Sequence, residues 1–274
     1  MRKSDEGRTV SIWEATEELV EGGTTIPGST EVCVVGGGIA GLTTAYLLSK
    51  AGKEVTVIDD GLIGGGETCR TTAHLSNALD DRIYRVEEWH GEDKAKLAVE
   101  SHGRAIDTIE NISNSEQIDC DFARVDGYLF EADDDRGEDD LDKEFDAARR
   151  CGIDVEWVET SFGRSIRFPR QGQFHVLKYL SGLAKAITAN GGTLVSNTRV
   201  KEWKGGDSPR VITTRGDIAA ERIVLATNYP LMSKMFAELP AYRTYAIGLT
   251  LESGTVEPAL YWDNADPYIY VRTQ

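Results

Sequence analysis

The sequence is poor in cysteine and in basic residues. Its 4 Cys, at positions 33, 69, 120 and 151, form no CxxC pair and no disulfide framework, which favours a reduced, cytoplasmic setting. Only 30 Lys and Arg stand against 46 Asp and Glu, so the formal net charge is −16. A surface of that sign repels nucleic-acid phosphate and anionic lipid headgroups. We therefore expect no nucleic-acid partner.

Long hydrophobic runs are also missing. The most apolar stretch, residues 32–48, is interrupted by glycine and threonine, and a buried strand that leads into a buried helix explains it better than a membrane span. Polar residues 4–7 follow the basic start of the chain, where a secretion signal would be apolar. With 40% hydrophobic and 28% charged residues, we expect a soluble protein of one large domain or two interleaved ones.

The first third of the chain predicts a parallel βαβ unit. After a polar leader over residues 1–30, with Trp13 as an aromatic anchor, a β-branched run over residues 31–35 predicts a buried strand. Residues 39–51 predict a helix because their apolar side chains recur every three or four positions, and residues 54–59 predict a second strand. Two strands joined through one helix in this way must run parallel.

The rest of the chain continues with mixed patterns, after a loop of small residues over 61–77. Helices are predicted over residues 92–113, 141–151 and 176–190, and strands over residues 121–130, 193–195, 198–200 and 221–227. Short strands separated by Gly, Pro and Asp over residues 242–272 predict an antiparallel layer. Acidic runs at 133–135 and 138–140 lack the glycine and final glutamate spacing of a calcium loop, so they predict a hydrated turn and no metal site.

A glycine-rich motif joins the first predicted strand to the first predicted helix. Residues 36–41 have the sequence GGGIAG, a match to GxGxxG. The motif alone is a weak signal, but here it directly follows a hydrophobic strand and opens a helix, which is its context in dinucleotide-binding folds. Gly36 permits the tight turn, Gly38 lets the backbone approach a pyrophosphate, and Gly41 lets helix and strand come close. The amide groups at the start of the helix would face the phosphates.

An acidic residue ends the next predicted strand. Asp59 lies about 20 residues beyond the glycines, the spacing at which a carboxylate accepts hydrogen bonds from the ribose. Such a carboxylate would repel the 2′-phosphate of NADP. Asp60 is interpreted as its solvent-facing neighbour. The alternative is a glycine-rich turn with an acidic strand end that binds no ligand.

The motif and the acidic residue do not separate FAD from NAD, but two further features favour FAD. Small residues and hydroxyl groups over residues 64–75 suit a backbone that passes close to a long cofactor. A late strand over residues 224–227 could return to the nucleotide sheet and close the pocket.

The chain resembles flavoproteins of the D-amino-acid oxidase and glycine oxidase superfamily, and within it the branch often fused to a C-terminal Rieske iron–sulfur domain. The matching stretches are residues 11–15 (SIWEA), 34–46, 71–75 (TTAHL), 118–122 (IDCDF), 173–175, 178–180 and 268–272. The dinucleotide motif is shared by many flavoproteins, whereas the TTA and IDCDF segments are more specific to this branch. Together the matches cover nearly the whole chain.

The resemblance implies an α/β fold, in which a Rossmann-like FAD-binding domain carries an inserted antiparallel α+β substrate domain. Residues 31–85 and 170–235 would form the FAD-binding domain, and residues 86–169 and 236–274 the substrate domain. The implied cofactor is FAD. The implied reaction is the oxidation of an amine or amino acid, in which hydride passes from the carbon that bears the nitrogen to flavin N5.

Carried over by position, the resemblance also implies a set of cofactor contacts. Those at the pyrophosphate and the ribose would be Gly36, Gly38, Ile39, Ala40, Gly41 and Asp59, with Asp60 beside them. Those along the pyrophosphate and the flavin ring would be Arg70, Thr71, Thr72, Ala73 and His74. Val200 would touch the adenine through its backbone, and Ala226 and Thr227 would line the same pocket.

Two residues are candidates for a catalytic role. His74 stands where the branch often has lysine; it would tune the flavin or relay a proton, or else be a loop histidine with an ordinary hydrogen bond. Tyr268 matches a tyrosine that binds the substrate carboxylate in glycine oxidase-like relatives, although aromatic residues on a β layer usually serve packing. Arg70 would stabilise anionic reduced flavin or pair with Glu67. No histidine spacing typical of a metal site is present.

The family continues past a Tyr-x-Arg strand into a glycine-rich segment that contacts the flavin, and this sequence does not contain that segment. We therefore expect a truncated chain with an incomplete substrate domain, and a Rieske domain as a partner in a full-length protein. Two other functions stay open: an NAD-dependent dehydrogenase of the same fold, and a nucleotide-binding fragment without catalysis.

Overall fold

The computed structural model describes residues 10–132, 140–228 and 244–273. The chain divides into two compact units, and we describe each by itself. Unit 1 comprises Met1–Thr71, Ile118–Cys120 and His175–Ala246, and unit 2 comprises Thr72–Gln117, Asp121–Phe174 and Ile247–Gln274. Several predicted features lie outside the described residues: the start of the leader over 1–9, the acidic runs over 133–139, and the segment over 229–243.

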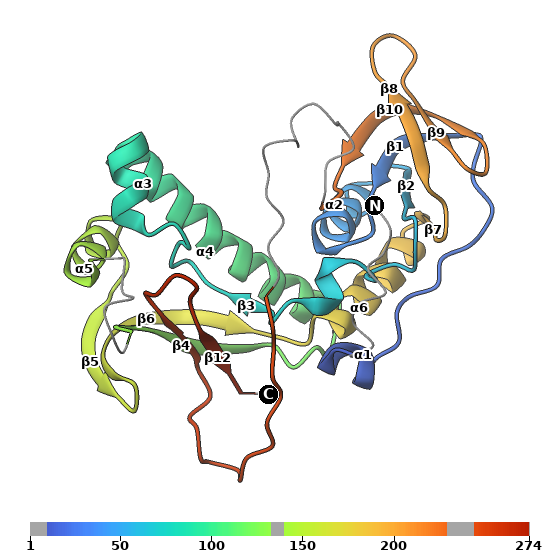
Figure 1. The fold of residues 1–274 in the computed structure, drawn as a ribbon. Coiled ribbons are helices and arrows are strands. Elements are labelled where there is room, and N and C mark those ends of the chain that lie inside the picture. The colour runs from blue at the N-terminus through green and yellow to red at the C-terminus, as the bar shows by residue number, and fades with distance from the viewer. Residues whose placement is uncertain (1–9, 133–139, 229–243, 274) are drawn as a thin grey trace. The chain divides into compact units, whose positions relative to one another are not determined.

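Unit 1 is built on a sheet whose central strand is β1 (Ser29–Val35), as Figure 1 shows. β1 pairs in parallel with β2 (Val55–Ile58) on one side and with β10 (Asp217–Leu225) on the other. The sheet continues in parallel from β2 to β7 (Thr193–Val195), and in antiparallel pairs from β10 to β9 (Arg210–Thr213) and β8 (Val200–Lys204). The predicted βαβ unit is therefore confirmed, whereas β8 begins at Val200, two residues after the start of the strand predicted over 198–200.

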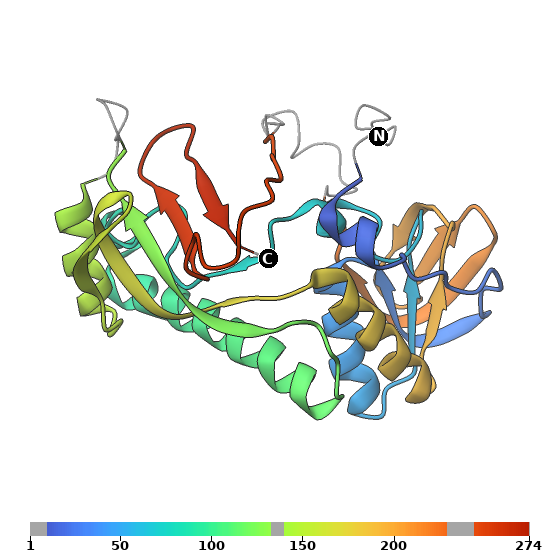
Figure 2. The same ribbon diagram turned by 90° about the horizontal axis from the view of Figure 1, so that it is seen from below.

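Two helices lie together on one face of this sheet, as Figure 2 shows. α2 (Ile39–Lys50) buries Leu42 and Ala45 completely, and its chain turns away at Gly52, whose φ of 80° favours glycine. α6 (Val176–Ala189) is capped by His175, whose Nδ1 accepts a hydrogen bond from the Lys178 amide at 3.3 Å. Both helices follow the apolar spacing that the sequence predicts.

The polar leader is part of unit 1 and carries structure of its own. α1 (Ile12–Thr16) begins with a capping box, in which Ser11 and Glu14 bond to each other's backbone amides. Farther along, Val20 forms an isolated bridge with Ile63, and Gly23 with Val195. These long-range pairs join the described part of the predicted leader to the rest of unit 1.

Unit 2 contains a second sheet, with the strand order β12-β11-β4-β6-β3 and β5 beside β6. The strands are β3 (His74–Leu75), β4 (Ala123–Phe130), β5 (Glu156–Thr160), β6 (Gly163–Gln173), β11 (Leu260–Asp263) and β12 (Tyr270–Arg272). The sheet is antiparallel except where β11 pairs in parallel with β4. The prediction of an antiparallel layer near the end of the chain is correct for β11 with β12 and wrong for β11 with β4.

The helices of unit 2 supply the other half of its core. They are α3 (Ile83–His90), α4 (Glu92–Ser115) and α5 (Leu141–Arg150). Leu129 of β4, with Ile166 and Phe168 of β6, belongs to one buried cluster with Ile83 of α3 and Ala147 of α5. Burial of these apolar side chains is the main source of stability for this unit.

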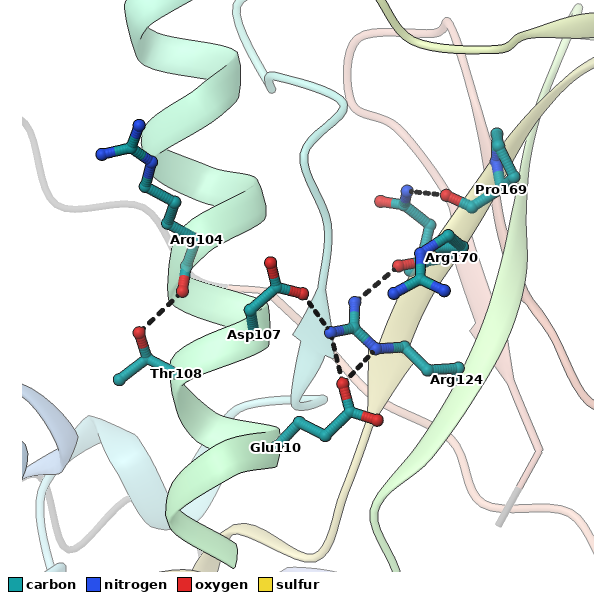
Figure 3. Close-up of polar contacts among 8 residues, drawn as sticks. Arg104, Asp107, Thr108, Glu110, Arg124, Pro169 and Arg170 are labelled. Carbon is teal, nitrogen blue, oxygen red and sulfur yellow. Dashed lines mark hydrogen bonds and ion pairs between the residues drawn. The ribbon is translucent and has the colours of Figure 1, made fainter. Parts of the chain in front are cut away.

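One arginine joins three elements of unit 2 (Figure 3). Arg124 of β4 donates from Nε and Nη2 to Glu110 Oε2 at 2.9 and 2.6 Å, and from Nη2 to Asp107 Oδ1 at 2.5 Å, both on α4. Its Nη1 donates to the backbone carbonyl of Arg170 in β6 at 2.9 Å. The Arg124 side chain is 19% exposed. The four bonds fix α4 against the sheet and hold Arg170, whose φ is 58°.

The bounds of the compact units differ from those of the predicted domains: residues 72–85 and 170–174 lie in unit 2, and residues 118–120 lie in unit 1. Residues 72–85 were predicted to belong with the nucleotide motif, whereas they lie in unit 2. The reason is pairing: His74 and Leu75 pair with Gln173 and Gly172 of β6, and α3 contacts α4 and α5. Such contacts join residues far apart in the chain and leave no local pattern.

Candidate cofactor site

The turn after β1 brings three backbone segments of unit 1 into close contact. Gly36 has a φ of 110°, and a Cβ atom on it would lie 2.5 Å from the carbonyl oxygen of Ala226. A Cβ on Gly41 would lie 1.9 Å from the carbonyl oxygen of Gly36. No side chain can occupy either position without moving the backbone. The first and last glycines of the motif therefore have the roles that the sequence predicts.

The start of α2 lacks a side-chain cap from its N-cap residue. Gly38 is its N-cap residue and provides no side-chain hydrogen bond, so the first amide groups of the helix have no intrahelical acceptor. The hydroxyl of Thr68 accepts one bond, from the Ile39 amide at 3.3 Å. Amides at a helix start, together with the positive end of the helix dipole, form a ready site for phosphate. Thr68 is not among the site residues predicted from the sequence, because one hydroxyl in a loop of small residues gives no specific signal for a role at the helix start.

Asp59 lies at the carboxyl end of β2, beside the glycine turn. Its Oδ2 accepts a hydrogen bond from the Gly37 amide at 2.7 Å, and its Oδ1 accepts one from the Gly61 amide at 2.8 Å. Each carboxylate oxygen has a second lone pair, so this arrangement orients Asp59 and leaves it able to accept from ribose hydroxyls. Asp60 is exposed, as expected of a solvent-facing neighbour.

Ala226 and Val200 border the same region from two other strands. The Ala226 amide donates to the Val35 carbonyl at 2.8 Å, which continues the parallel pairing of β1 and β10 by one residue. Thr227 follows it and is half-buried. The Val200 side chain is 7% exposed and belongs to a buried cluster with Val35 and Ile58. The contact of its backbone with adenine stays a prediction.

The segment after the glycine-rich loop is fastened to α1. η1 (Glu67–Arg70) is a single 3₁₀ turn, and Thr71 follows it. Trp13 is 3% exposed, and its Nε1 donates to the Thr71 carbonyl at 2.7 Å. Its ring meets His175 edge to face, with centroids 5.0 Å apart. Arg70 is exposed, and within the part of the chain that the structure describes no ion pair joins it to Glu67.

The other predicted flavin contacts, Thr72, Ala73 and His74, belong to unit 2. Arg272 on β12 donates from Nη1 to the carbonyl of Thr72 at 2.6 Å and to that of Ala73 at 3.2 Å. These bonds hold Ala73 at a φ of 55°, a left-handed conformation that is unusual for alanine. Burial and, to a smaller extent, the charge of Arg272 lower the pKa of His74 to about 4. His74 is therefore a neutral imidazole at neutral pH.

Tyr268 lies in unit 2 shortly before β12. Its side chain is 44% exposed, and its ring lies 5.6 Å from that of Tyr270. Burial of the hydroxyl, with the nearby charge of Asp80, raises its pKa. The structure places Tyr268, Tyr270 and His74 in one unit but assigns Tyr268 no hydrogen bond among the described residues, so its role in substrate binding stays a prediction.

Cysteine, metal and membrane features give no further candidate site among the described residues. All four cysteines are buried and none of them forms a disulfide bond, and no group of histidine, cysteine or acidic side chains in the described residues could hold a metal ion. No helix in the described ranges has the length and apolar character needed to cross a membrane. Cys120, in the IDCDF segment, is 1% exposed, and its carbonyl accepts from the His175 amide at 2.7 Å.

The site in unit 1 thus combines a helix start, two obligatory glycines and an oriented carboxylate. A family model described as FAD-dependent oxidoreductase, the DAO family, matches residues 31–274. The chain belongs to this family. FAD is therefore the cofactor that the family implies, and the residues of unit 1 fit it: Gly36 and Gly41 form a cradle that a Cβ would fill, and the N-cap residue of α2, Gly38, has no side chain that would take up the helix amides.

Curated relatives in the DAO family agree with this assignment. YhfW of Bacillus subtilis (strain 168), which is named as a Rieske 2Fe-2S iron–sulfur protein, is 33% identical over 207 residues, or 73% of this chain and 40% of the relative. The γ-glutamylputrescine oxidoreductase of Escherichia coli (strain K12) is 29% identical over 220 residues, covering 76% and 51%. The chain therefore spans about half the length of the curated relatives it matches.

Solved structures show the same fold. Glycine oxidase from Geobacillus kaustophilus superposes with a TM-score of 0.62 at 20% identity, covering 73% of this chain and 56% of that one. L-Proline dehydrogenase from P. horikoshii gives 0.61 at 22% identity, covering 74% and 54%. At these identities the likeness concerns the fold: a parallel βαβ sheet and a mostly antiparallel second sheet.

The contact between Trp13 and Thr71 leads to a prediction about cofactor affinity. Trp13→Phe keeps the ring but removes the Nε1 donor, so the segment that carries Thr68 and Arg70 loses its tie to α1. One neutral hydrogen bond contributes about 1 kcal/mol, so we expect FAD affinity to fall by up to about tenfold in calorimetric titration. Trp89→Phe, at a 59% exposed position on α3, is the matched control and should leave the affinity unchanged. Equal affinities for both variants would contradict a positioning role for Trp13.

Proposed function

We propose that unit 1 binds FAD and that the protein oxidises an amine or an amino acid. The observation that carries the proposal is the cradle of Gly36, Gly41 and Asp59 at the start of α2. Membership of the DAO family supports FAD as the ligand. The names of γ-glutamylputrescine oxidoreductase, glycine oxidase and L-proline dehydrogenase support a substrate with an oxidisable carbon–nitrogen bond.

In this proposal the residues of the chain bind and orient the cofactor. Bound FAD would supply the electron chemistry: the C–H bond next to nitrogen breaks, hydride and its two electrons pass to flavin N5, and the resulting imine hydrolyses. The amides at the start of α2 would hold the pyrophosphate, and Asp59 would accept from the ribose hydroxyls. Thr68, which bonds to the Ile39 amide, would keep the loop against the helix start.

Cofactor uptake is the first test. Purified chain is mixed with excess FAD, and in parallel with excess NAD, and is then passed through a desalting column. We expect retained flavin with its visible absorption bands, and a rise in melting temperature with FAD that exceeds the rise with NAD, because only a true ligand stabilises the folded state by mass action. Stabilisation by NAD alone would overturn the choice of FAD as cofactor. If the chain retained neither FAD nor NAD, the assignment of Gly36, Gly41 and Asp59 to a dinucleotide site would be overturned.

Substrate oxidation is a separate test. The FAD-loaded chain is mixed anaerobically with a primary amino acid, a secondary amino acid and an N-substituted diamine, and flavin absorbance is followed. Loss of the visible flavin absorption with any of them supports oxidation by this chain. Retention of the band with all three, in a chain that binds FAD, would support a nucleotide-binding fragment without catalysis.

The electron acceptor forms the last part of the proposal. The relation to YhfW supports an iron–sulfur protein as the partner that takes electrons from the reduced flavin, one at a time. If so, reduced chain should be reoxidised faster by an added [2Fe–2S] protein than by dissolved oxygen. Faster reoxidation by oxygen would count against this partner and leave FAD binding unaffected.

A further inference from the structure

A small cavity lies in unit 2 at the turn that joins β5 to β6. Its volume is about 240 Å³. Residues 158–161 of that turn line one part of it, residues 255–257 line another, and Tyr128 and Tyr261 complete the lining. All of these residues belong to unit 2. Pockets for drug-sized ligands measure roughly 300–1,000 Å³, so this one suits a smaller molecule or the end of a side chain.

The two tyrosines of the cavity are held in fixed positions. Tyr128 on β4 and Tyr261 on β11 are opposite residues of a parallel pair, and their rings stack with centroids 5.3 Å apart. Phe162 packs against Tyr261 at 5.2 Å. The Tyr261 hydroxyl donates to the backbone carbonyl of Glu257 at 3.1 Å, which joins the ring to the segment in front of β11. The rings therefore need no rearrangement to receive a ligand.

The two loop segments of the cavity are turns with hydrogen bonds of their own. The Thr160 hydroxyl accepts from the Phe162 amide at 3.1 Å and bonds to the Ser165 hydroxyl at 3.0 Å. The amide and the hydroxyl of Thr255 both donate to the Glu252 carbonyl, at 3.1 and 2.7 Å. A cavity with walls that are already ordered binds a ligand at a lower entropic cost.

The charge of the lining is negative. Glu159 and Glu257 are acidic, and none of the lining residues is basic. Among the described residues neither carboxylate takes part in an ion pair. Arg167, which lies opposite Tyr128 on β6, is already bound by Asp126 at 3.0 Å and by Glu156 at 2.8 Å, so two carboxylates balance its charge. The cavity therefore disfavours an anion and favours a cation.

The tyrosine hydroxyls add hydrogen-bond acceptors to this charge. Burial raises the pKa of Tyr128 and of Tyr261, and the charge of Glu257 raises both further, so both hydroxyls are neutral at neutral pH. The proton of Tyr261 is used by the Glu257 carbonyl, and the Tyr128 hydroxyl has no hydrogen-bond partner in the part of the chain that the structure describes. The two oxygens and the Glu257 carboxylate can thus accept from a ligand with several N–H groups.

The kind of cation is restricted further by the apolar part of the lining. Val158 and Val256 are half-buried and border the same cavity. A metal ion would leave them without a contact, and no group of histidine, cysteine or acidic side chains in the described residues could hold one. A primary alkylammonium ion has three N–H donors and a short apolar stem, so it matches both kinds of lining.

We propose that this cavity binds the end of a primary alkylammonium ion. Its ammonium group donates to the hydroxyl oxygens of Tyr128 and Tyr261 and to the carboxylate of Glu257, and its methylene stem contacts Val158 and Val256. A free amine and a lysine side chain of a partner share this chemistry. The site goes beyond the proposed function, since it lies wholly within unit 2 and requires no flavin.

The test uses the tyrosine rings as direct reporters. The full chain, labelled with ¹³C in the rings of its 10 Tyr, is titrated with n-butylammonium and with Nα-acetyl-lysine methylamide. Tyr128→Phe and Tyr261→Phe identify the two signals by their loss. We expect butylammonium to shift both signals. Butan-1-ol, which lacks the charge, and tetramethylammonium, which lacks the N–H donors, should shift them much less.

Each outcome supports or overturns the site. A half-maximal shift at lower concentration with butylammonium supports a free amine as ligand, and one with the lysine derivative supports a side chain of a partner. No shift with either overturns the site. Shifts with butan-1-ol or tetramethylammonium that equal those with butylammonium overturn the assignment to a primary ammonium group. Flavin retention is not measured here, so a failure of this site and a failure of the proposed function are distinguishable.

Affinities from the same titrations give a second readout. Glu257→Gln keeps the shape of an exposed side chain and removes its charge, so we expect butylammonium affinity to fall by about tenfold. Tyr128→Phe, followed through the Tyr261 signal, should lower it by up to about tenfold. Glu88→Gln, at an exposed position on α3, is the matched control and should bind as the wild type does. Wild-type affinity in folded Glu257→Gln and Tyr128→Phe would overturn the site.

Discussion

An alanine at position 41 is expected to lower FAD affinity by about a hundredfold. Its Cβ would lie 1.9 Å from the carbonyl oxygen of Gly36 and 3.4 Å from the Cβ of Ala226. The first of these is a backbone atom in a turn that is itself fixed by Gly36, so α2 has to move away from β1. That movement would take the helix amides away from the pyrophosphate. Losing two charge-assisted hydrogen bonds costs about 3 kcal/mol or more, which corresponds to this change in affinity.

Calorimetric titration with FAD measures this effect, and circular dichroism shows whether the variant is folded. Gly66→Ala is the matched control, since Gly66 lies in the following glycine-rich loop, has a φ of −90°, and has nothing within 4 Å of an added Cβ. The control should bind FAD as the wild type does. A folded Gly41→Ala variant with wild-type affinity would show that the close approach of α2 to β1 is not needed for binding.

Acidification from pH 6.5 to pH 4 is expected to destabilise the wild-type chain through His74. Burial, followed by the charge of Arg272, lowers the pKa of His74 to about 4 from 6.5. The unfolded chain therefore binds a proton more readily than the folded chain. The stability that comes from neutral His74 is fully present above pH 6.5 and is lost as the pH falls through this window. The whole shift corresponds to at most about 3 kcal/mol of unfolding free energy.

The contribution of His74 to the unfolding free energy can be measured by urea unfolding. The wild type and His74→Phe are unfolded at steps between pH 7 and pH 4. The carboxylates titrate in both proteins, so the difference between their unfolding free energies reports on His74. We expect this difference to shift steadily in favour of the variant as the pH falls. For the control His90→Phe, at an exposed position on α3, the unfolding free energy should change with pH as it does in the wild type. A constant difference for His74→Phe would mean that His74 is protonated equally in the folded and unfolded chains.

The glycine turn and the helix start of the candidate site could be predicted from the sequence because their determinants are local. A β-branched run, a GxGxxG turn and an amphipathic helix are neighbours in the chain, and each prediction depends on fewer than about 20 residues. The geometric demands on Gly36 and Gly41 come from the backbone itself, so the residue types already imply them. Asp59 was placed correctly at the end of β2, although its two bonds to backbone amides were not foreseen.

The parts that could not be predicted depend on contacts between distant residues. Trp13 was identified as an anchor, but its acceptor, the Thr71 carbonyl, is 58 positions away and is a backbone atom without a sequence signal. β6 contains Pro169 and several arginines, so its residues do not alternate cleanly between polar and apolar, and no strand was predicted there. Its pairing with β3 is what joins His74 to unit 2.

The order of the strands in unit 1 has a consequence for synthesis on the ribosome. β1 is among the first elements to leave the exit tunnel, but β10, which completes its hydrogen bonding on one side, begins only at residue 217, after every described element except β11 and β12. Until then one edge of an apolar strand stays exposed, and exposed edges of this kind recruit other strands. We therefore expect nascent chains stalled before residue 217 to bind chaperones or aggregate, and chains released with β10 to do so much less.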